Sequence, residues 1–505
     1  MQLKVLCDAA EIWYPQDTAE VEITGIFTDS REVTAGGLFI CIRGLRADGH
    51  LYIDDAIENG AQCILVDRYA EIEARDGVII LRASNTRRTS AYLFDAWYGF
   101  PSRRLKLVGV TGTNGKTSVT HMLRAILEAS LHRCGSIGTV GAVAVGKTYA
   151  GRASDPLANM TTPDPQVLYR LLTQMADDGV EYVVMEVSSH ALALEKTAPL
   201  MFEAVIFTNL TPEHLDFHRT MENYAAAKAR LMSQSRLAVI NADSPYAEMM
   251  RKHAVGRCIS CGVTNEDADY TALDVELLGR EGVRYRLYSM RTSLKISCAI
   301  PGSFTVLNSM QAAITALELG CSPSVIKSVL STMEGVKGRM ERVRLGFDAD
   351  FTVLIDYAHT PDALEKLLHT AKGFLGKSGR LTVLFGCGGD RDTIKRAVMG
   401  EIASRLSDNV ILTSDNSRSE KPQKIIDEIR AGMQEGTPCK IIPDREAAIR
   451  YAIAQATAGE VILLAGKGHE EYEISSAGRR HFCEREIAID AYKARRRIKK
   501  HEETE

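Results

Sequence analysis

Short apolar runs recur along the chain, and stretches with helical spacing separate them. In the middle of the sequence such runs lie at residues 105–111, 181–187, 204–210 and 237–243. A run that is apolar throughout is typical of a strand that is covered on both faces. Alternation of such strands with helices predicts a parallel sheet with helices on both sides.

The same alternation marks two flanking regions. The first contains a predicted strand at residues 38–44 and a helix that runs into another strand at 53–67. The last contains apolar runs in "FTVLIDY", "RLTVLFG", "NVILTSD" and "EVILLAG". Pro101 and a basic turn separate the first region from the middle one. The sequence therefore predicts an α/β fold with three domains, at residues 1–102, 103–336 and 337–505.

The composition limits which partners are expected. The 505 residues are 45% hydrophobic and carry a formal net charge of −4. This small charge gives no basic field that would favour nucleic acid or an anionic membrane. No segment reaches the roughly 18 apolar residues of a membrane span, and the N-terminal residues do not resemble a secretory signal. We therefore expect a cytoplasmic protein that binds neither nucleic acid nor membrane, and we expect a monomer.

The cysteines and the basic C-terminal run suggest no chemistry of their own. The eleven cysteines are scattered and odd in number, which fits reduced thiols. Only Cys258 and Cys261 form a C-x-x-C motif. We interpret them as small buried residues, with a metal or redox role as the alternative. The basic run in "YKARRRIKKHEETE" reads as a solvated helix end, and partner binding is its alternative.

The segment "GVTGTNGKTSVT", residues 109–120, predicts an anion site. A buried strand precedes it, and apolar residues recur at helical spacing after Lys116. At such a strand-to-helix turn, unpaired backbone N–H groups and the helix dipole both face an anion. The apolar positions of the predicted helix are Val119, Met122, Leu123, Ile126 and Leu127.

This loop differs from the usual phosphate loop by one position. G-x-x-x-x-G-K-[ST] needs a glycine where this chain has Val110, so the loop is a variant. Gly112 and Gly115 can still supply the unusual dihedrals and the close approach of the backbone. Lys116 can reach the β and γ phosphates, and Thr117 can ligate Mg²⁺. The alternative is a tight turn with an incidental Gly-Lys-Thr.

The variant loop resembles that of the Mur ligase superfamily, whose members carry G-T-N-G-K-T or G-T-x-G-K-T after a central-domain strand. The resemblance extends along nearly the whole chain in the family's order. It is strongest to the members that add the third residue of the peptidoglycan stem peptide. The segments that carry it are "TDSREVTAGGLFICIRG", "MTTPDP", "MEVSSHAL", "FTNLTPEHLDFH", "NYAAAKARL", "GRMERV", "DYAHTPDAL", "FGCGGDRD", "SDNSRSE" and "AGKGHEEYE".

The resemblance implies an architecture and a reaction. A central P-loop ATPase domain with a parallel sheet is flanked by an N-terminal uridine-nucleotide domain and a C-terminal Rossmann-like domain. ATP converts a carboxylate of UDP-N-acetylmuramoyl-L-Ala-D-Glu into an acyl phosphate, and an amine then displaces phosphate. The γ-phosphate and the carboxylate are both anionic, so cations must bring them together. The implied cofactors are two Mg²⁺ ions, with CO₂ bound as a lysine carbamate.

Four residues form the expected catalytic set. Lys116 supplies positive charge to the phosphates, and Glu186 ends an apolar strand from which it can meet a magnesium bound by Thr117. A strand cap is the alternative for Glu186. The resemblance makes His214 a ligand of the second magnesium and Lys228 its carbamate ligand, whereas local sequence alone favours an exposed helical lysine at 228. Asp216 and His218 are expected to be structural. The metal set is therefore Thr117, Glu186, His214 and carbamylated Lys228.

ATP is expected between the central and C-terminal domains. The resemblance places adenine near Asn308 and makes Arg339 reach the phosphates. Relatives often read F-N before that asparagine, where this chain has Phe304 and Thr305, so the adenine contacts differ. The full ATP set is Gly112, Thr113, Asn114, Gly115, Lys116, Thr117, Asn308, Arg339, Asp356, Tyr357 and His359.

The uridine substrate is expected to meet residues of the first two domains. Leu194 and Lys196 stand where better-known members have glutamine and arginine. A lysine can meet an anion, but without the fork of a guanidinium, so binding there is expected to be rearranged. The residues that match substrate contacts are Thr28, Ser30, Thr161, Thr162, Ser188 and Lys196.

The segment "SDNSRSE" bears on which amino acid is added. Members that add meso-diaminopimelate carry D-N-P-R here, and the arginine meets the distal carboxylate. Arg418 keeps that fork, while Ser417 replaces the proline. We predict meso-diaminopimelate over L-lysine; a ligase for another amino acid or pathway and a non-catalytic nucleotide-binding regulator are the alternatives. The expected amino-acid contacts are Arg391, Asp415, Asn416, Ser417, Arg418, Gly466 and Glu470, of which Glu470 suits a distal ammonium.

Overall fold

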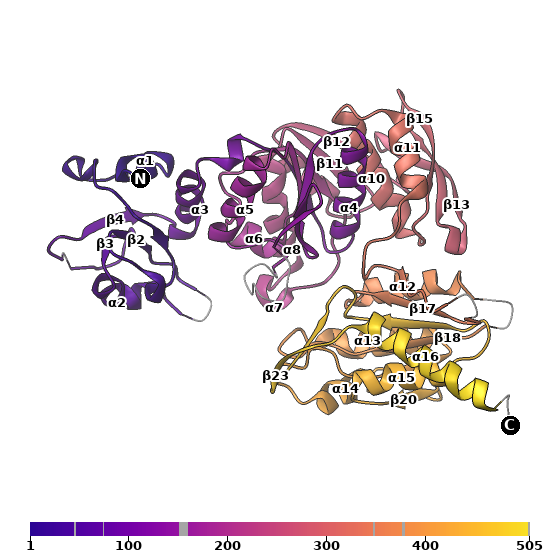
Figure 1. The fold of residues 1–505 in the computed structure, drawn as a ribbon. Helices are drawn as coiled ribbons and strands as arrows, with labels where there is room; N and C mark the ends of the chain where they lie inside the picture. Colours follow the sequence, from indigo (N-terminus) through magenta and orange to yellow (C-terminus); the bar gives the residue numbers. More distant parts are fainter. Residues whose placement is uncertain (45–46, 74, 151–159, 347–348, 376–378, 503–505) are drawn as a thin grey trace.

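Three main sheets organise the chain, one for each predicted domain. The computed structural model describes residues 1–44, 47–73, 75–150, 160–346, 349–375 and 379–502. Figure 1 shows the N-terminal part in indigo, the central part from purple through magenta to salmon, and the C-terminal part in orange and yellow. The predicted α/β class is confirmed. Within the described ranges, no helix combines the length and apolar character that a bilayer crossing requires.

The N-terminal sheet has four parallel strands with helices on both faces. Leu38 and Ile40 pack with helices α1 and α3, whereas Phe39 packs with α2 on the opposite face. The predicted strand at 38–44 is shorter in the structure and ends at Ile40. The elements are α1 Leu3–Ala9, β1 Ile26–Phe27, β2 Gly37–Ile40, α2 Ile53–Glu58, β3 Ala61–Asp67, β4 Ile79–Ala83 and α3 Thr86–Trp97.

The central sheet is parallel in its middle and antiparallel at both edges. Strand order is β15-β14-β13-β12-β11-β10-β5-β9-β6-β7-β8. The predicted parallel pairing is correct for the neighbouring strands β6, β9, β5, β10, β11, β12 and β13. The prediction missed β7, β8, β14 and β15, which pair antiparallel. The strands are β5 Lys106–Thr111, β6 Cys134–Gly138, β7 Gly141–Ala144, β8 Lys147–Ala150, β9 Tyr182–Glu186, β10 Phe202–Phe207, β11 Leu237–Asn241, β12 Arg257–Gly262, β13 Tyr270–Leu277, β14 Val283–Tyr288 and β15 Ser293–Cys298.

Strand β5 lies in the middle of this sheet, between β9 and β10. The chain runs to one side of β5 for β6 and β9, then crosses to the other side for β10. Ligands of open α/β sheets bind in the crevice at such a change of direction. The helices are α4 Lys116–Ala129, α5 Pro165–Asp177, α6 Ser189–Ala193, α7 Leu215–His218, α8 Met221–Ala229, α9 Ala247–His253, α10 Phe304–Glu318 and α11 Pro323–Thr332.

The C-terminal sheet has the order β16-β17-β21-β18-β19-β20, with only β16 antiparallel to its neighbour. Two core clusters cover its two faces. The elements are β16 Glu341–Arg342, β17 Thr352–Asp356, α12 Pro361–Lys372, β18 Leu381–Phe385, α13 Ile394–Leu406, β19 Asn409–Leu412, α14 Pro422–Arg430, β20 Cys439–Ile441, α15 Arg445–Gln455, β21 Val461–Ala465, β22 Tyr472–Ser475, β23 Gly478–His481 and α16 Glu484–Glu502.

Arg445 joins the segment after β19 to the end of β21, two strands that β18 separates in the sheet. Its guanidinium is fully buried, pairs with Glu484 at 2.8 Å, and donates to the carbonyl oxygens of Ser414 and Ala465 at 3.0 and 2.8 Å. Loss of one partner of such a buried pair costs about 3–5 kcal/mol. The backbone after β19 and β21 is therefore held in one place.

The C-x-x-C motif lies on one strand and does not pair. Cys258 packs against the core on one face of β12, and Cys261 belongs to the core on the other face. Residues three apart on a strand point to opposite sides. Both are free thiols, so the interpretation as small packing residues fits the structure. The basic C-terminal run lies at the end of α16, and residues 503–505 lie outside the described residues.

Candidate active site

The phosphate loop connects β5 to α4 and approaches its neighbours closely. Gly115 has φ +86°, and a Cβ there would lie 2.5 Å from Asn308 Oδ1. A Cβ on Gly112 would lie 1.9 Å from Thr208 Oγ1. Because neither position has room for a Cβ, the loop requires glycine at 112 and at 115. Lys116 Nζ turns back and donates to the carbonyl oxygens of Gly112 and Thr113 at 2.9 and 2.8 Å.

Hydrogen bonds tie this loop to the segment after β10. Asn114 N donates to Asn209 Oδ1 at 2.9 Å, and Thr208 Oγ1 donates to Asn114 O at 2.6 Å. Thr113 Oγ1 lies 3.1 Å from Tyr224 Oη on α8. These contacts fix the loop, while the first N–H groups of α4 have no partner within the helix.

Lys228 lies under this loop and is not exposed. Its side chain comes from α8, its residue is 1% exposed, and Nζ donates to Gly112 O at 2.8 Å. The ammonium lies 4.7 Å from the centroid of the Tyr224 ring. Burial and the charge of Lys116 lower the pKa of Lys228 well below its ordinary value. The expectation from local sequence alone, an exposed helical lysine, is wrong.

Two carboxylates lie near the lysines, Glu186, which is buried, and Glu213, which is partly buried. Glu186 ends β9 and accepts from Thr139 N and Oγ1, both at 2.9 Å. Glu213 Oε1 lies 3.0 Å from His359 Nε2. Burial raises the pKa of Glu213, but the hydrogen bond to His359 and the charges of His214, His359 and Lys116 outweigh it, so this pKa lies well below its usual range.

His214 follows Glu213 in a left-handed backbone conformation, with φ 57°. Its Nε2 lies 3.6 Å from Glu213 Oε2, and burial lowers its pKa to about 4. His218 Nε2 lies 2.9 Å from Ser189 Oγ and is buried, whereas Asp216 lines a cavity. Across the described ranges, no three His, Cys, Asp or Glu side chains gather as a metal-binding group.

The C-terminal domain contacts the phosphate loop directly. Arg339 Nη2 donates to Thr117 Oγ1 at 3.3 Å, and its guanidinium lies 4.8 Å from the centroid of the Tyr357 ring. Asn114 Nδ2 donates to Asp362 Oδ2 at 3.0 Å. These contacts join two residues of the loop to the other domain.

A small cavity of ≈ 90 Å³ lies at this junction. Asp356 lines it, and its carboxylate accepts from Met340 N and Ala358 N at 2.6 and 2.7 Å. Thr305 does not line it and instead donates to Pro301 O. The expected ATP residues that line this cavity are Asn114, Gly115, Asn308, Arg339 and Asp356, whereas Tyr357 and His359 line a larger cavity.

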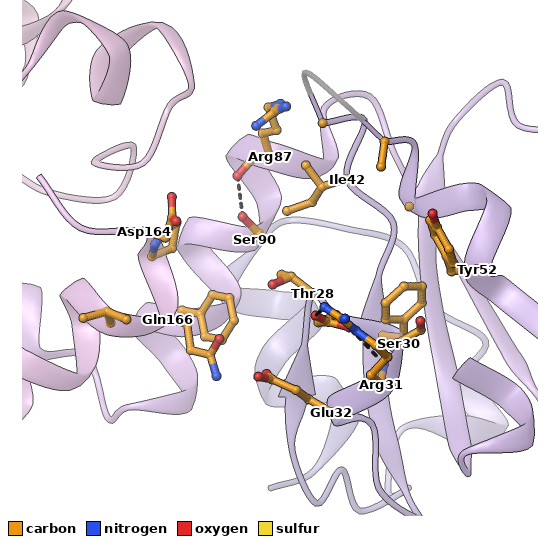
Figure 2. Close-up of a pocket in the computed structure, with 18 of the residues that line it drawn as sticks. Thr28, Ser30, Arg31, Glu32, Ile42, Tyr52, Arg87, Ser90, Asp164 and Gln166 are labelled. Atoms are coloured by element: carbon orange, nitrogen blue, oxygen red, sulfur yellow. Dashed lines mark hydrogen bonds and ion pairs between the residues drawn. The ribbon is translucent and has the colours of Figure 1, made fainter. Parts of the chain in front are cut away.

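A cavity of ≈ 740 Å³ lies between the N-terminal and central domains. Figure 2 shows Thr28 and Ser30 on one side of it and Asp164 and Gln166 on the other. Lys196 also lines this cavity, and its Nζ pairs with Asp164 at 2.7 Å. This lysine, which stands where the resemblance to better-known members leads us to expect arginine, is therefore already paired with a carboxylate.

A cavity of ≈ 520 Å³ lies between the central and C-terminal domains and is lined by residues of both. Thr161, Thr162 and Ser188 line its central side, together with Glu213 and His214. Leu194 and Lys196 line both this cavity and the ≈ 740 Å³ cavity, so the two lie next to each other. The expected amino-acid contacts that line the C-terminal side are Arg391, Asp415, Asn416, Arg418, Gly466 and Glu470, while Ser417 is buried outside the lining.

Arg418 is oriented by backbone groups. It has φ 50°, and its Nη1 donates to Gly389 O at 2.7 Å. No ion pair joins Arg418 to a carboxylate among the residues that the structure describes. A guanidinium has five N–H donors, so several remain for a ligand in the cavity.

The sequence interpretation missed several residues of the site. Glu213 stands directly before His214, which is a signal that the motif offered. Asp362 is the second residue of helix α12, and Thr139 directly follows strand β6, so neither position reveals a contact to the loop or to Glu186. These contacts join segments that are far apart in the chain, and that of Asp362 also joins two domains. The missed residues are Thr139, Asn209, Glu213, Asp362 and Lys467.

Comparisons with known proteins identify the family. Residues 22–93 match "Mur ligase family, catalytic domain", residues 110–316 match "Mur ligase middle domain", and residues 338–468 match "Mur ligase, glutamate ligase domain". The chain belongs to the Mur ligase family, as its motifs predict.

Several relatives carry the same enzyme name. A "UDP-N-acetylmuramoyl-L-alanyl-D-glutamate--2,6-diaminopimelate ligase" of Syntrophomonas wolfei is 42% identical, over 93% of this chain and 94% of its own. The protein of the same name from Geobacillus thermodenitrificans is 39% identical, over 98% and 100%. A solved structure with this enzyme name is 29% identical, covers 98% of this chain and 100% of its own, and has a TM-score of 0.69.

Gly115→Ala should weaken ATP binding. A side chain at φ +86° is strained, and the Cβ forces either the loop or the Asn308 amide to move. A strained conformation costs about 1–3 kcal/mol, so we expect affinity for ATP to fall by about tenfold or more, measured by calorimetry. Gly146→Ala is the control, because Gly146 has φ +73° but open space around it. Equal ATP affinity in both variants would contradict the loop geometry.

Proposed function

We propose that this protein is an ATP-dependent ligase that joins meso-diaminopimelate to the D-Glu carboxylate of UDP-N-acetylmuramoyl-L-Ala-D-Glu, in peptidoglycan precursor synthesis. The observation that carries the proposal is the ≈ 520 Å³ cavity. The residues expected to meet the substrate peptide and those expected to meet the amino acid line its two sides. The names of the relatives support the same reaction. We propose that it acts in the cytoplasm as a monomer.

The arrangement of cavities supports the path of the uridine substrate. Thr28 and Ser30 line the ≈ 740 Å³ cavity, and Thr161, Thr162 and Ser188 line the ≈ 520 Å³ cavity. Because Lys196 lines both, a substrate with its nucleotide in one cavity and its peptide in the other would pass this residue. The peptide carboxylate then lies on the side of Glu213 and His214.

The charges at the loop support acyl phosphate formation. Lys116 and Arg339 place positive charge at the loop, where the γ-phosphate and the carboxylate must approach each other. The carboxylate oxygen attacks the γ-phosphorus, ADP leaves, and an amine then attacks the acyl carbon and releases phosphate. Contacts between the C-terminal domain and the loop would keep water away from the acyl phosphate.

The donor set fits magnesium. Mg²⁺ prefers oxygen ligands and commonly binds one or two protein groups plus phosphates, so the hydroxyl of Thr117 and the buried carboxylate of Glu186 are suitable. We propose two magnesium ions, the second held by His214 and a carbamate on Lys228. Magnesium would neutralise charge on the phosphates. Thr117, Glu186, His214 and Lys228 then form the metal set.

The environment of Lys228 supports a carbamate. A lysine amine must be neutral to attack CO₂, and burial beside Lys116 lowers the pKa of Lys228 well below its ordinary value. Its nitrogen would bond to the carbon of CO₂ and lose a proton, which gives an anion. That anion would replace repulsion between two ammonium groups with attraction to Lys116.

The amino-acid side of the cavity supports diaminopimelate. Arg418 is oriented by Gly389 O, and its free N–H groups suit a carboxylate at the distal end of the ligand. Glu470 lines the same side of this cavity and suits the ammonium there. L-lysine has no distal carboxylate, so it would leave this guanidinium without its partner.

The proposed reaction is tested by phosphate release. With ATP and UDP-N-acetylmuramoyl-L-Ala-D-Glu, we expect release to require an amino acid and to be fastest with meso-diaminopimelate. Phosphate release that depends neither on UDP-N-acetylmuramoyl-L-Ala-D-Glu nor on an amino acid would reject the ligase reaction. A nucleotide-binding regulator without catalysis would release no phosphate under any of these conditions.

Lys228→Ala should nearly abolish turnover, by about 100-fold or more, because the anionic ligand and its charge are lost. Added acetate or formate should partly restore activity, since a short carboxylate supplies oxygens at the same place. Lys252→Ala is the control, because Lys252 is a helical lysine with a side chain 72% exposed. Full activity of Lys228→Ala in the phosphate-release assay would contradict the carbamate.

Arg418→Ala should reduce the preference for meso-diaminopimelate over L-lysine. A lost charge-assisted contact of about 2 kcal/mol corresponds to roughly 30-fold in relative kcat/KM. Competition kinetics with both amino acids measure this ratio. Arg405→Ala is the control, since Arg405 pairs with Glu365 and Glu401 on the surface. An unchanged ratio in Arg418→Ala would show that another residue selects the amino acid.

A further inference from the structure

Lys467 lies beneath the amino-acid side of the ≈ 520 Å³ cavity, and the reaction described above gives it no role. It is fully buried. Its Nζ donates to Asn416 Oδ1 and to Tyr472 O, both at 3.0 Å, and lies 5.5 Å from the centroid of the Phe482 ring. A buried ammonium is stable only with acceptors and negative charge around it. Its surroundings therefore indicate what it holds.

Two carboxylates balance this ammonium. Lys467 Nζ lies 3.7 Å from Asp415 Oδ1 and 4.0 Å from Glu470 Oε2. Both carboxylates line the cavity, whereas the lysine lies behind them. Among the described residues, Lys467 is the only Lys or Arg within 4.0 Å of the Glu470 carboxylate, whereas Arg445 also acts on Asp415. A cationic group of a ligand at Glu470 would give this carboxylate a second positive partner.

The amide of Asn416 links the lysine to one of these carboxylates. Its Oδ1 accepts from Lys467 Nζ at 3.0 Å and from Ile474 N at 2.9 Å. Its Nδ2 donates to Glu470 Oε2 at 2.7 Å. A flipped amide would place its NH₂ against two donors and its oxygen against a carboxylate, which is unfavourable. Lys467 and the Ile474 N–H together fix which end of the amide meets Glu470.

We propose that Lys467 is a positioning residue that, through the Asn416 amide, holds the charged Glu470 carboxylate in place for the non-reacting ammonium group of the incoming amino acid. The proposal rests on the proposed function, because it concerns the second substrate of that reaction. It does not require Lys467 to touch any substrate.

The charges around Glu470 give the proposal a pH signature. Burial raises the pKa of Glu470 and the charge of Asp415 adds to this, while Lys467 and the hydrogen bond from Asn416 lower it. Loss of Lys467 would raise this pKa further, so less carboxylate would be charged at a given pH. The acid limb of kcat/KM for the amino acid would then move to higher pH. The groups that face Glu470 are Asp415, Asn416, Lys467, His359, Tyr357 and Tyr472.

The test compares Lys467→Met with Lys337→Met in the full chain. Lys337 is the matched control, because it pairs with the next carboxylate, Glu471, but is half-exposed. Phosphate release is measured against meso-diaminopimelate concentration across pH, with ATP and the uridine substrate saturating. For Lys467→Met we expect kcat/KM for meso-diaminopimelate to fall about tenfold. The acid limb of its pH profile should move to higher pH by about one unit. KM for ATP should be unchanged, and Lys337→Met should match the wild type.

Asn416→Asp tests the same link if Lys467→Met does not fold. The new carboxylate still accepts from Lys467 and Ile474, but it cannot donate to Glu470. It should therefore move the acid limb in the same direction. An unshifted limb in every folded variant would overturn the role of Lys467. A wild-type protein that releases no phosphate with meso-diaminopimelate would instead reject the proposed function, so the two failures are distinguishable.

Discussion

The carbonyl oxygen of Gly112 accepts hydrogen bonds from two lysines. Lys116 reaches it at 2.9 Å from the start of α4, and Lys228 at 2.8 Å from α8. Burial removes the water that would screen two such neighbouring ammonium groups, and the pKa of each is lowered. Glu186 and Glu213 counter this effect at Lys116, and Glu213 does so at Lys228. Most of the site is built around this pair of lysines.

Each of the three domains contributes a different part of the site around these lysines. The central sheet presents the loop at the carboxyl end of β5, and the C-terminal domain contacts the loop through Arg339 and Asp362. The N-terminal domain contributes one side of the ≈ 740 Å³ cavity. Each cavity described here lies between two domains, so the shape of every cavity depends on how the domains meet.

The sequence predicted the strands of the buried core because uninterrupted apolar runs leave few alternatives. It missed the antiparallel edges, where β14 alternates buried and exposed residues and offers a weaker pattern. The phosphate loop was predictable from local spacing, whereas Lys228 was interpretable only through the family resemblance. Asp362 and Lys467 carry no local signal at all, since their contacts join segments that are far apart in the chain.

The backbone contacts of Arg445 have an evolutionary consequence. Its guanidinium donates to the carbonyl oxygens of Ser414 and Ala465, and every amino acid has such an oxygen. The side chains that follow, from Asp415 to Arg418, take no part in its two backbone contacts. A lineage can therefore exchange side chains that line the ≈ 520 Å³ cavity, and with them the shape and charge of that cavity, while the backbone beneath them keeps its course.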